Sequence, residues 1–214
     1  MRLILLGPPG SGKGTQAKLL AERLKVVHIG TGDILREAVR QGTAAGKMAA
    51  PYVVSGKLVP DSLVNEVITE QFRREDRPDC FVMDGYPRTL AQAAAFDQVL
   101  RQQFLDIEAV MLLLVRDDEI VRRLTGRLSC PKCKTTYHVL KNPPRVPGRC
   151  DNDGTELIQR PDDKEDVVRE RLRVYRANTE ELIPHYREQG QLREVDGEGS
   201  IEQVYANIQK ALKG

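Results

Sequence analysis

The sequence lacks a long apolar segment and an excess of charge of either sign. Its first apolar run, Leu3–Leu6, is too short for the core of a signal peptide, and no stretch is long enough to span a bilayer. The 33 basic and 31 acidic residues leave a formal net charge of +2, which indicates neither a nucleic-acid partner nor a membrane partner. Repeats and low-complexity tracts are also absent. We therefore expect a globular, cytoplasmic enzyme.

The clearest feature that the sequence does contain is the glycine-rich stretch Gly7–Thr15, which reads GPPGSGKGT. The preceding run is predicted to be a buried strand, and apolar residues at helical spacing follow, namely Ala17, Leu20, Ala21 and Leu24. A strand, a glycine-rich turn and a helix together are typical of a phosphate-binding loop. The glycines let backbone N–H groups surround phosphate oxygens, and Lys13 and the helix N-terminus add positive charge. The chain is therefore predicted to bind a nucleotide.

One position of this loop departs from the general pattern, in which Ser or Thr follows the lysine. Here Gly14 follows Lys13, and Thr15 comes one place later. The sequence therefore does not decide which hydroxyl group would contact a magnesium ion. The predicted binding of phosphate by the loop does not depend on that choice. A tight turn that binds nothing is the alternative, but four glycines and a lysine within nine residues favour the phosphate loop.

Short apolar segments alternate with helical patterns along the rest of the chain. We predict strands at residues 3–6, 26–29, 80–83, 110–115 and 191–195. One of the helices between them is predicted to begin with Asp61 as its N-cap, and Cys80 is predicted to be an ordinary core residue of its strand. The alternation predicts an α/β fold, with a parallel sheet covered by helices on both faces.

Two segments depart from this alternation. Residues 30–59 are poor in large apolar side chains and rich in Gly and Ala, which predicts a small helical insertion. Residues 126–163 contain clustered prolines and three of the four cysteines, but too few large apolar residues for a core of their own. The predicted core domain is the remainder, residues 1–29, 60–125 and 164–214.

Asp84 follows the third predicted strand at its carboxyl end. Because parallel strands end at the same edge of a sheet, this carboxylate is predicted to lie beside the phosphate loop, where it could hold Mg²⁺ directly or through water. The segment Gly85-Tyr86-Pro87-Arg88 comes next, and Thr89 with Gln92 then matches a helix capping box. The sequence therefore leaves open whether Gln92 has only a structural role, as part of the helix cap.

The cysteines of the 126–163 segment have the spacing of a metal site. Cys130 and Cys133 form a C-x-x-C pair, and Cys150 begins a second half in which Asp153 repeats the same spacing. Two ligand pairs at this separation are typical of structural zinc sites. A disulfide between the first two cysteines is the alternative, disfavoured in a reducing cytosol. The alternative fourth ligands are Asp151 and His138.

Together these residues resemble the adenylate kinases, in the long form whose lid holds a zinc ion. The resemblance spans nearly the whole chain and follows the family's order and spacing. The phosphate loop alone is shared with many ATPases, whereas the segment from Asp84 to Arg88 is much more specific to nucleoside monophosphate kinases. The resemblance rests on Gly7–Thr15, Thr31-Gly32-Asp33, Asp84–Arg88, Gly126-Arg127, Arg160 with Asp162-Asp163, and Arg171.

This resemblance implies reversible phosphoryl transfer from MgATP to AMP, giving two ADP, by a monomer with a P-loop fold and a five-stranded parallel sheet. Residues 30–59 would close on AMP, and residues 126–163 would form a zinc-binding lid over ATP. Closure is needed because water would otherwise hydrolyse the γ-phosphoryl group. The implied zinc would be structural and would supply folding free energy on the order of 10 kcal/mol. Its implied ligands are Cys130, Cys133, Cys150 and Asp153.

The resemblance also implies the roles of individual residues. The predicted catalytic residues are Lys13, Asp84, Arg88, Arg123, Arg127, Arg160 and Arg171. The predicted ATP contacts are Gly10, Ser11, Gly12, Lys13, Gly14, Thr15, Arg127, Thr136, Tyr137 and Gly199. The predicted AMP contacts are Thr31, Arg36, Lys57, Leu58, Val59, Gly85, Tyr86, Pro87, Arg88, Gln92, Arg160 and Arg171. A solvated helix face is the alternative for any single arginine.

Two other functions compete with this interpretation. A kinase for GMP, CMP or UMP would share the fold, and Thr31 and Gln92 favour adenine only through the resemblance. A zinc-ribbon protein that binds nucleic acid is the alternative from another class. Its cysteine-containing segment has Tyr137 as its one aromatic stacking residue, and the chain is near neutral, so no nucleic-acid partner is expected.

Overall fold

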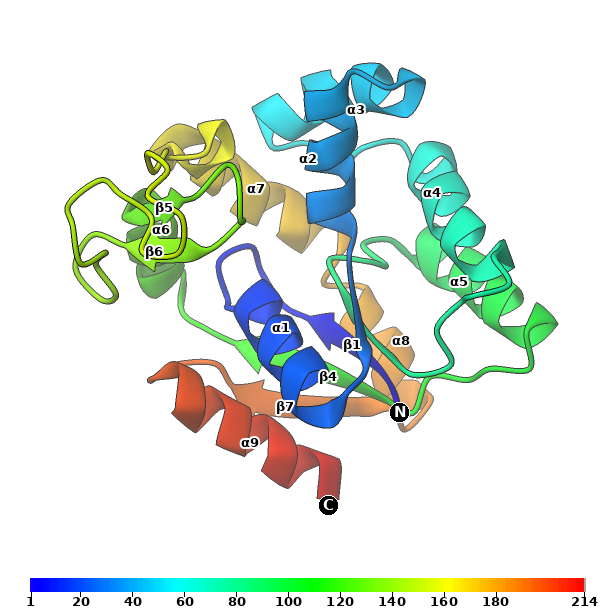
Figure 1. Cartoon of the computed structure of the whole chain (residues 1–214). Coiled ribbons are helices and arrows are strands. Elements are labelled where there is room, and N and C mark those ends of the chain that lie inside the picture. Colours follow the sequence, from blue (N-terminus) through cyan, green and yellow to red (C-terminus); the bar gives the residue numbers. More distant parts are fainter. Residues whose placement is uncertain (214) are drawn as a thin grey trace.

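The structure, a computed structural model, describes residues 1–213. Parallel strands form its central sheet: β1 (Arg2–Leu6), β2 (Val27–Gly30), β3 (Phe81–Asp84), β4 (Ala109–Leu114) and β7 (Leu192–Asp196). Their spatial order is β2–β3–β1–β4–β7, so the strand that leads into the glycine-rich loop is central (Figure 1). The predicted α/β fold with a five-stranded parallel sheet is confirmed.

Helices cover both faces of this sheet. In β1, Ile4 and Leu6 belong to one buried cluster and Leu3 and Leu5 to another, because successive side chains of a strand point to opposite faces. The first cluster is covered by α4 (Asp61–Arg73), α5 (Leu90–Gln102) and α8 (Leu182–Glu188), and the second by α1 (Lys13–Leu24) and α9 (Ile201–Lys213). Among the described residues, none of the helices is long and apolar enough to cross a membrane.

The 30–59 segment is helical, as the sequence predicts. It folds into α2 (Thr31–Gln41) and α3 (Ala44–Ser55), which stand above the carboxyl edge of the sheet (Figure 1). The two helices approach closely at Gly46, where an added Cβ atom would lie 2.0 Å from the carbonyl oxygen of Ala38. The small residues of this segment therefore allow a tight helical pair.

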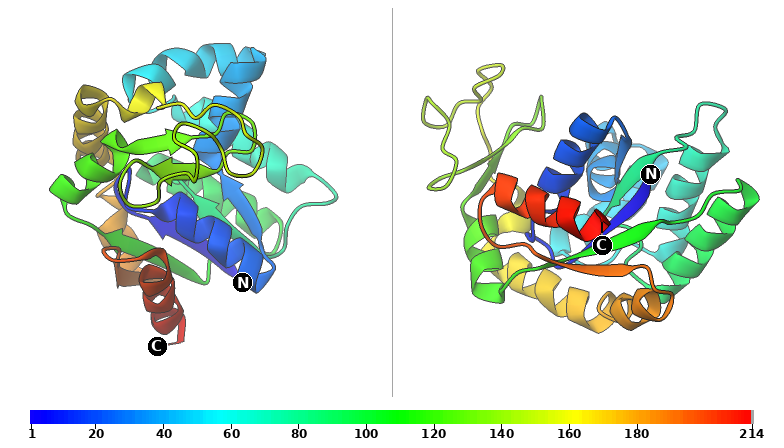
Figure 2. Two further views of the ribbon diagram at one scale, coloured as in Figure 1. Left: turned by 60° about the vertical axis from the view of Figure 1, so that its left-hand side comes forward. Right: turned by 90° about the horizontal axis from the view of Figure 1, so that it is seen from below.

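The 126–163 segment follows α6 (Asp117–Thr125) and precedes α7 (Glu165–Asn178). Its strands β5 (Arg127–Ser129) and β6 (Thr136–His138) form an antiparallel pair, and the short helix η1 (Pro161–Asp163) ends it. Figure 2 shows the segment projecting from the body of the molecule as a set of loops. Its buried cluster is small and half cysteine, so apolar burial alone holds it weakly; the cluster contains Cys130, Tyr137, Cys150 and Leu157.

The prediction that Asp61 caps α4 is wrong. Pro60 occupies the N-cap position, and Asp61 is the first residue of the helix. The Asp61 carboxylate instead accepts hydrogen bonds from Thr89 Oγ1 (2.8 Å) and Gln92 Nε2 (2.7 Å) at the start of α5. It therefore joins the beginnings of two neighbouring helices, because the second helix offers it donors that its own helix does not.

The prediction for Cys80 is also wrong. The strand β3 begins one residue later, and Cys80 is exposed. Its sulfur accepts a hydrogen bond from the amino group of Met1 at 3.0 Å. An apolar run thus predicted the strand correctly but extended it by one residue. The sequence analysis also gave no separate helix where α8 lies.

Candidate functional site

A cavity of about 630 Å³ lies at the carboxyl edge of the sheet. Its walls come from the phosphate loop, α2, the segment Asp84–Arg88, the 126–163 segment and α7. Segments that are far apart in the sequence thus converge on one space. Ligand-binding loops of open α/β sheets lie at this edge because they follow the carboxyl ends of the strands.

The loop Gly7–Thr15 curls around the ammonium group of Lys13. Lys13 Nζ donates hydrogen bonds to the carbonyl oxygens of Gly7 (2.7 Å) and Pro8 (2.8 Å). Gly12, with φ at +99°, is the N-cap of α1, and residues with a side chain rarely adopt this conformation. Burial lowers the pKa of Lys13 to about 8, although the charge of Asp84 opposes the shift. Phosphate oxygens in this loop would favour the charged lysine.

Asp84 lies directly beside the phosphate loop. It ends β3, which pairs with the central strand so that Asp84 is opposite Leu5. A Cβ atom added to Gly14 would lie 3.1 Å from Asp84 Oδ2, so a Ser or Thr at position 14 would crowd this carboxylate. Thr15 is exposed and lines the cavity together with Asp84. Their oxygens are ligands of the kind that Mg²⁺ prefers.

Arginines from separate elements line the same cavity. Burial lowers the pKa of Arg160 and of Arg171 to about 10, and the charges of neighbouring arginines add to both shifts. Positive charge is thus concentrated in a space that is partly shielded from water, which suits a polyphosphate ligand. The arginines that line the cavity are Arg36, Arg88, Arg123, Arg127, Arg160 and Arg171.

Two aspartates of η1 pair with these arginines. Asp163 is fully buried, and its carboxylate accepts hydrogen bonds from Nε and NH2 of Arg127. Asp162 Oδ2 lies 3.1 Å from Arg171 NH1 and 3.9 Å from Arg36 NH1. Burial disfavours the ionised form of Asp162, but these guanidinium groups outweigh burial and lower its pKa. Sequence reasoning gave neither aspartate a role, although both stand in a motif that carries the family resemblance.

A second cluster of functional side chains lies in the 126–163 segment. Cys130, Cys133, Cys150 and Asp153 each offer one ligand atom, and these atoms all lie within 4.8 Å of one another. The sulfurs of Cys133 and Cys150 are 3.4 Å apart, and Cys130 Sγ is 3.6 Å from Asp153 Oδ1. A tetrahedron with Zn–S bonds of about 2.3 Å has edges of about 3.8 Å, so the donors and their spacing fit zinc.

The other ligands considered from the sequence are engaged elsewhere. Asp151 Oδ1 accepts a hydrogen bond from the backbone N–H of Arg145 at 2.9 Å. His138 Nδ1 accepts hydrogen bonds from the backbone N–H groups of Leu140 and Lys141. All the cysteines of the chain, which lie within the described residues, are free thiols. The cluster therefore consists of the ligand set that the sequence favours.

Local hydrogen bonds favour the metal-binding forms of Cys133 and Asp153, whereas burial raises the pKa of Cys150. Hydrogen bonds with the side chain and backbone of Thr135 lower the pKa of Cys133 to about 7. The backbone N–H of Thr155 lowers the pKa of Asp153 to about 2. A thiolate and a carboxylate are thereby available near neutral pH, which is what zinc requires of its ligands.

Comparison with known proteins places this geometry in a family. The family profile described as adenylate kinase matches residues 5–191. The chain is 48% identical over 212 residues to the adenylate kinase of Methanothrix thermoacetophila, covering 99% of this chain and 98% of that protein. It is 48% identical over 213 residues to the adenylate kinase of Archaeoglobus fulgidus, covering 100% and 98% of the two chains. The adenylate kinase of Moorella thermoacetica is 46% identical over 212 residues, with 99% and 98% covered.

The chain belongs to the adenylate kinase family. It is therefore an enzyme, a kinase that transfers phosphoryl groups between adenine nucleotides.

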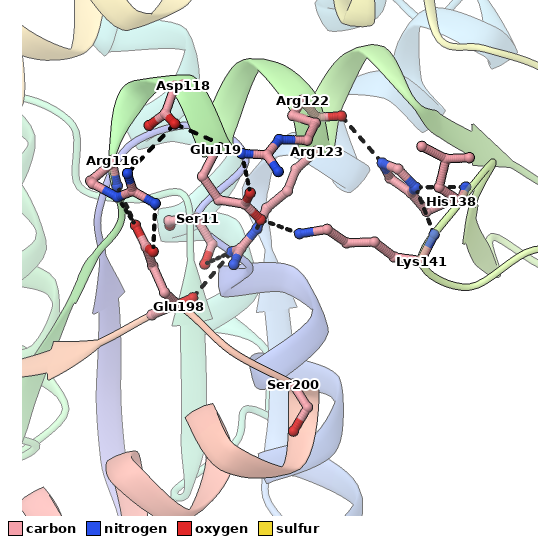
Figure 3. Close-up of polar contacts among 12 residues, drawn as sticks. Ser11, Arg116, Asp118, Glu119, Arg122, Arg123, His138, Lys141, Glu198 and Ser200 are labelled. Carbon is pink, nitrogen blue, oxygen red and sulfur yellow. Dashed lines mark hydrogen bonds and ion pairs between the residues drawn. The ribbon is translucent and has the colours of Figure 1, made fainter.

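In this adenylate kinase, the residues predicted to contact ATP all lie at the cavity. Tyr137 is nearly buried, and its hydroxyl accepts a hydrogen bond from the backbone N–H of Asp151 at 2.8 Å. Arg123 reaches from α6 toward the phosphate loop, where its NH1 group lies 3.4 Å from the carbonyl oxygen of Ser11 (Figure 3). The residues of this set that line the cavity are Gly10–Thr15, Arg127, Thr136, Tyr137 and Gly199.

The residues predicted to contact AMP fall into two groups. One group lines the cavity: Arg36, Leu58, Gly85, Pro87, Arg88, Arg160 and Arg171. In the described part of the chain, the other group is not in the cavity lining: Thr31, Lys57, Val59, Tyr86 and Gln92. Thr31 is 1% exposed, and its hydroxyl donates a hydrogen bond to the carbonyl oxygen of Asp84 at 3.2 Å. Thr31 thus joins the start of α2 to the end of β3.

Gln92 occupies a structural position in the kinase. Its backbone N–H donates to Oγ1 of Thr89, the N-cap of α5, at 3.1 Å. Its side-chain oxygen accepts a hydrogen bond from the backbone N–H of Arg88, and its side-chain nitrogen donates to Asp61, both at 2.7 Å. The cap exists, and Gln92 also fixes the backbone that carries Arg88. A contact between Gln92 and adenine stays a prediction.

Proposed function

We propose that the chain catalyses the reversible transfer of a phosphoryl group from MgATP to AMP, giving two ADP, and so balances the adenine nucleotides. The observation that carries this proposal is the convergence of Lys13 and arginines from several separate elements on one cavity. Phosphoryl transfer is catalysed mainly by positioning and charge stabilisation, and one well-placed arginine contributes about 10³–10⁵ in rate. Membership of the family supports the same reaction.

We assign the two nucleotides to opposite parts of the cavity. Lys13 and the loop amides would hold the ATP phosphates, and Thr136, Tyr137 and Gly199 would border the nucleoside. Arg36 and Arg88 would hold the AMP phosphate, while Thr31, the backbone of Lys57–Val59 and Gln92 would contact its adenosine. The remaining arginines would stabilise the transferring group: Arg123, Arg127, Arg160 and Arg171.

The proposed domains follow from these assignments. Residues 30–59 form the AMP-binding part, residues 126–163 the lid, and residues 1–29, 60–125 and 164–214 the core. Both smaller parts contribute walls to the cavity. They also contact each other, because Lys134 Nζ lies 3.5 Å from Glu37 Oε2. Closure of either part would therefore change the surroundings of the other.

Two metal ions complete the proposal. Mg²⁺, bound with ATP, would neutralise phosphate charge, and Asp84 would hold it directly or through water. Zinc would be structural, held by the Cys130, Cys133, Cys150 and Asp153 cluster, in a segment whose apolar cluster is small. We further propose that the enzyme is cytoplasmic, because thiol ligands persist in a reducing compartment. That it acts as a monomer is proposed from the family resemblance alone.

The first test is ADP formation from MgATP with AMP, GMP, CMP or UMP as the acceptor. Wild type should turn over AMP strongly and the other acceptors weakly. Arg88→Ala should lose most of this activity, because a cavity-lining guanidinium would no longer bind the acceptor phosphate. Arg101→Ala changes an exposed arginine of α5 and serves as the matched control, with activity expected at the wild-type level.

The acceptor panel also separates the competing functions. Equal or faster turnover with GMP, CMP or UMP would keep the kinase reaction and discard the adenine roles of Thr31 and Gln92. Tight ATP binding without turnover of any acceptor would contradict the proposed reaction. A nucleic-acid-binding function would then have to be tested by the salt dependence of RNA and DNA binding.

A further inference from the structure

Glu119, in the first turn of α6, has no part in the function proposed above, yet it is nearly buried and carries several ionic contacts. Its side chain is 8% exposed. Glu119 Oε1 accepts a hydrogen bond from Arg123 Nε at 2.7 Å and also pairs with Lys141 Nζ from the 126–163 segment (Figure 3). Glu119 Oε2 lies 3.3 Å from Arg122 NH2. A buried carboxylate with this many cationic partners holds side chains in fixed positions.

The partner with a proposed catalytic role is Arg123. Its NH1 group donates to the carbonyl oxygen of Gly197 at 3.1 Å and lies 3.4 Å from the carbonyl oxygen of Ser11. Ser11 belongs to the phosphate loop (Figure 3), and Gly197 lies between β7 and α9 in the chain. Within residues 1–213, the NH2 group of Arg123 makes no hydrogen bond, unlike its Nε and NH1 groups. Glu119 thus holds the Nε group and two carbonyl groups hold NH1, so that NH2 is the group of Arg123 without a hydrogen bond among the described residues.

Glu119 is negatively charged at neutral pH. Burial disfavours its ionised form, but the bonds from Lys141 and Arg123 outweigh burial and lower the pKa of Glu119 to about 2. Glu119 therefore stays an acceptor for Arg123 at neutral pH. Because Lys141 shares the same carboxylate oxygen, Arg123 does not have to neutralise Glu119 alone and keeps positive charge at the cavity wall.

We propose that Glu119 is a positioning residue, which acts on bound ATP through Arg123. Glu119 fixes the guanidinium against the phosphate loop before the nucleotide arrives, so that its free NH2 group meets a phosphate in the correct place. The proposal rests on the role assigned to Arg123 in the function above. Misplacement of a catalytic group by about 1 Å costs on the order of 100-fold in rate, so the positioning has a measurable effect.

The test is a double-mutant cycle of Glu119→Ala and Arg123→Ala, measured as kcat and KM for ATP at saturating AMP. Each single variant should lower kcat by about 10- to 100-fold. The double variant should be no slower than Arg123→Ala within about 3-fold, because Glu119 has no effect once Arg123 is gone. The KM for ATP should rise less than kcat falls in Glu119→Ala, because the variant also removes a negative charge near an anionic ligand.

A conservative variant and a neighbouring one complete the design. Glu119→Gln keeps an oxygen acceptor for Arg123 Nε and should retain kcat within about 3-fold of wild type. Asp118→Ala removes an exposed carboxylate of the same helix turn and should leave both constants unchanged. If Glu119→Ala does not fold, Glu119→Met takes its place in the cycle with the same expected values, because it keeps the length of the side chain and offers no oxygen acceptor to Arg123.

Two outcomes would overturn the proposal. The first is a double variant whose loss equals the product of the two single losses, because Glu119 would then act independently of Arg123. The second is a Glu119→Gln variant as slow as Glu119→Ala, because charge and not the hydrogen bond to Arg123 would then matter. Absence of ATP:AMP phosphotransfer in the wild type would instead contradict the proposed function itself, and the two failures are thereby distinguishable.

Discussion

Lys13 places a positive charge where the folded chain benefits from it only when phosphate is bound. Burial lowers its pKa to about 8 from 10.5, so between these two pH values the unfolded chain binds more protons than the folded chain. The free energy of unfolding must therefore rise with pH in this window. Below pH 8 the buried charge destabilises the fold, and above pH 10.5 this destabilisation is gone.

The predicted rise of the free energy of unfolding with pH can be checked by denaturant unfolding of wild type and Lys13→Met between pH 7.5 and pH 10.5, without nucleotide. The wild-type value minus the variant value should rise by up to about 1.4 kcal/mol per pH unit inside the window. Lys210→Met, on the exposed side of α9, is the matched control, for which the difference should stay flat. A flat difference for Lys13→Met as well would contradict the proposed effect of burial.

Residues whose role depends on local sequence were predictable, and residues whose role depends on distant partners were not. The order of Gly and Lys predicts the phosphate loop, and the spacing of the cysteines predicts the metal cluster. Both patterns are short local motifs. Asp162 and Asp163 gain theirs from arginines that come from other elements. Glu119 likewise depends on Lys141, which follows it by 22 positions. Carboxylates are common on exposed helix turns, so nothing in the local sequence marked Glu119, and the family motif marked Asp162 and Asp163 without giving them a role.

At the scale of elements, we expect the 126–163 segment to depend on the proposed zinc more than on apolar burial. Its small cluster contains two of the proposed zinc ligands, Cys130 and Cys150. Removal of zinc with a chelator should therefore increase amide hydrogen exchange over residues 127–158, with little change in β4 and β1. Structural zinc sites supply on the order of 10 kcal/mol, far more than this apolar cluster can replace.

The measurement is hydrogen exchange read by mass spectrometry, together with the metal content of the purified protein. Wild type should carry zinc, and Cys150→Ser should lose it. Cys80→Ser changes a cysteine outside the cluster and should keep the wild-type metal content. Unchanged exchange after complete removal of the metal would show that the segment does not depend on zinc for its fold.

Most elements were predictable because their apolar residues follow a clear period. The central strands β1 and β4 are continuous apolar runs, as strands buried on both faces should be. Boundaries were less certain, since β3 begins at Phe81 and α4 begins after Pro60. The short helix α8 was missed because it is only 7 residues long and has Pro184 inside it, so its period is weak.

At the scale of the whole molecule, the spatial order of the strands could not be read from the sequence. Periodicity predicts that parallel strands exist, but not that β3 lies between β2 and β1. That order places Asp84 beside the phosphate loop. It also places α2 on one side of this loop, and α6 and α7 on the other side. The position of Asp84 beside the phosphate loop was predictable from the parallel strands, but the convergence of α2, α6 and α7 on the same space was predictable only through the family resemblance.

The pairing of arginines with Asp162 has a consequence for the stability of the whole chain. Asp162→Asn leaves Arg171 and Arg36 without this negative partner in a partly buried site. The free energy of unfolding without nucleotide should fall by about 1–3 kcal/mol, the value of a hydrogen bond to a charged group. MgATP and AMP together should then stabilise the variant more than wild type, because the phosphates no longer compete with that carboxylate.

Thermal unfolding with and without the nucleotides measures this difference. Asp166→Asn, at an exposed position of α7, is the control and should match wild type in both conditions. A smaller stabilisation of Asp162→Asn by nucleotides would mean that Asp162 helps to bind them, and that its pairing with the arginines is incidental.

If nucleotides bind as proposed, their phosphates would exchange with the carboxylates of η1 for the same arginines, as anions exchange on a charged resin. Asp162 and Asp163 are paired with arginines, so phosphates would not enter an unpaired field of positive charge but would compete with carboxylates that already neutralise it. An anion gains from this exchange only if it brings more charge and more hydrogen-bond acceptors than a carboxylate does. Chloride or a small monoanion fails this condition, whereas a chain of phosphates meets it. We therefore expect the cavity to select polyvalent anions before any base is recognised.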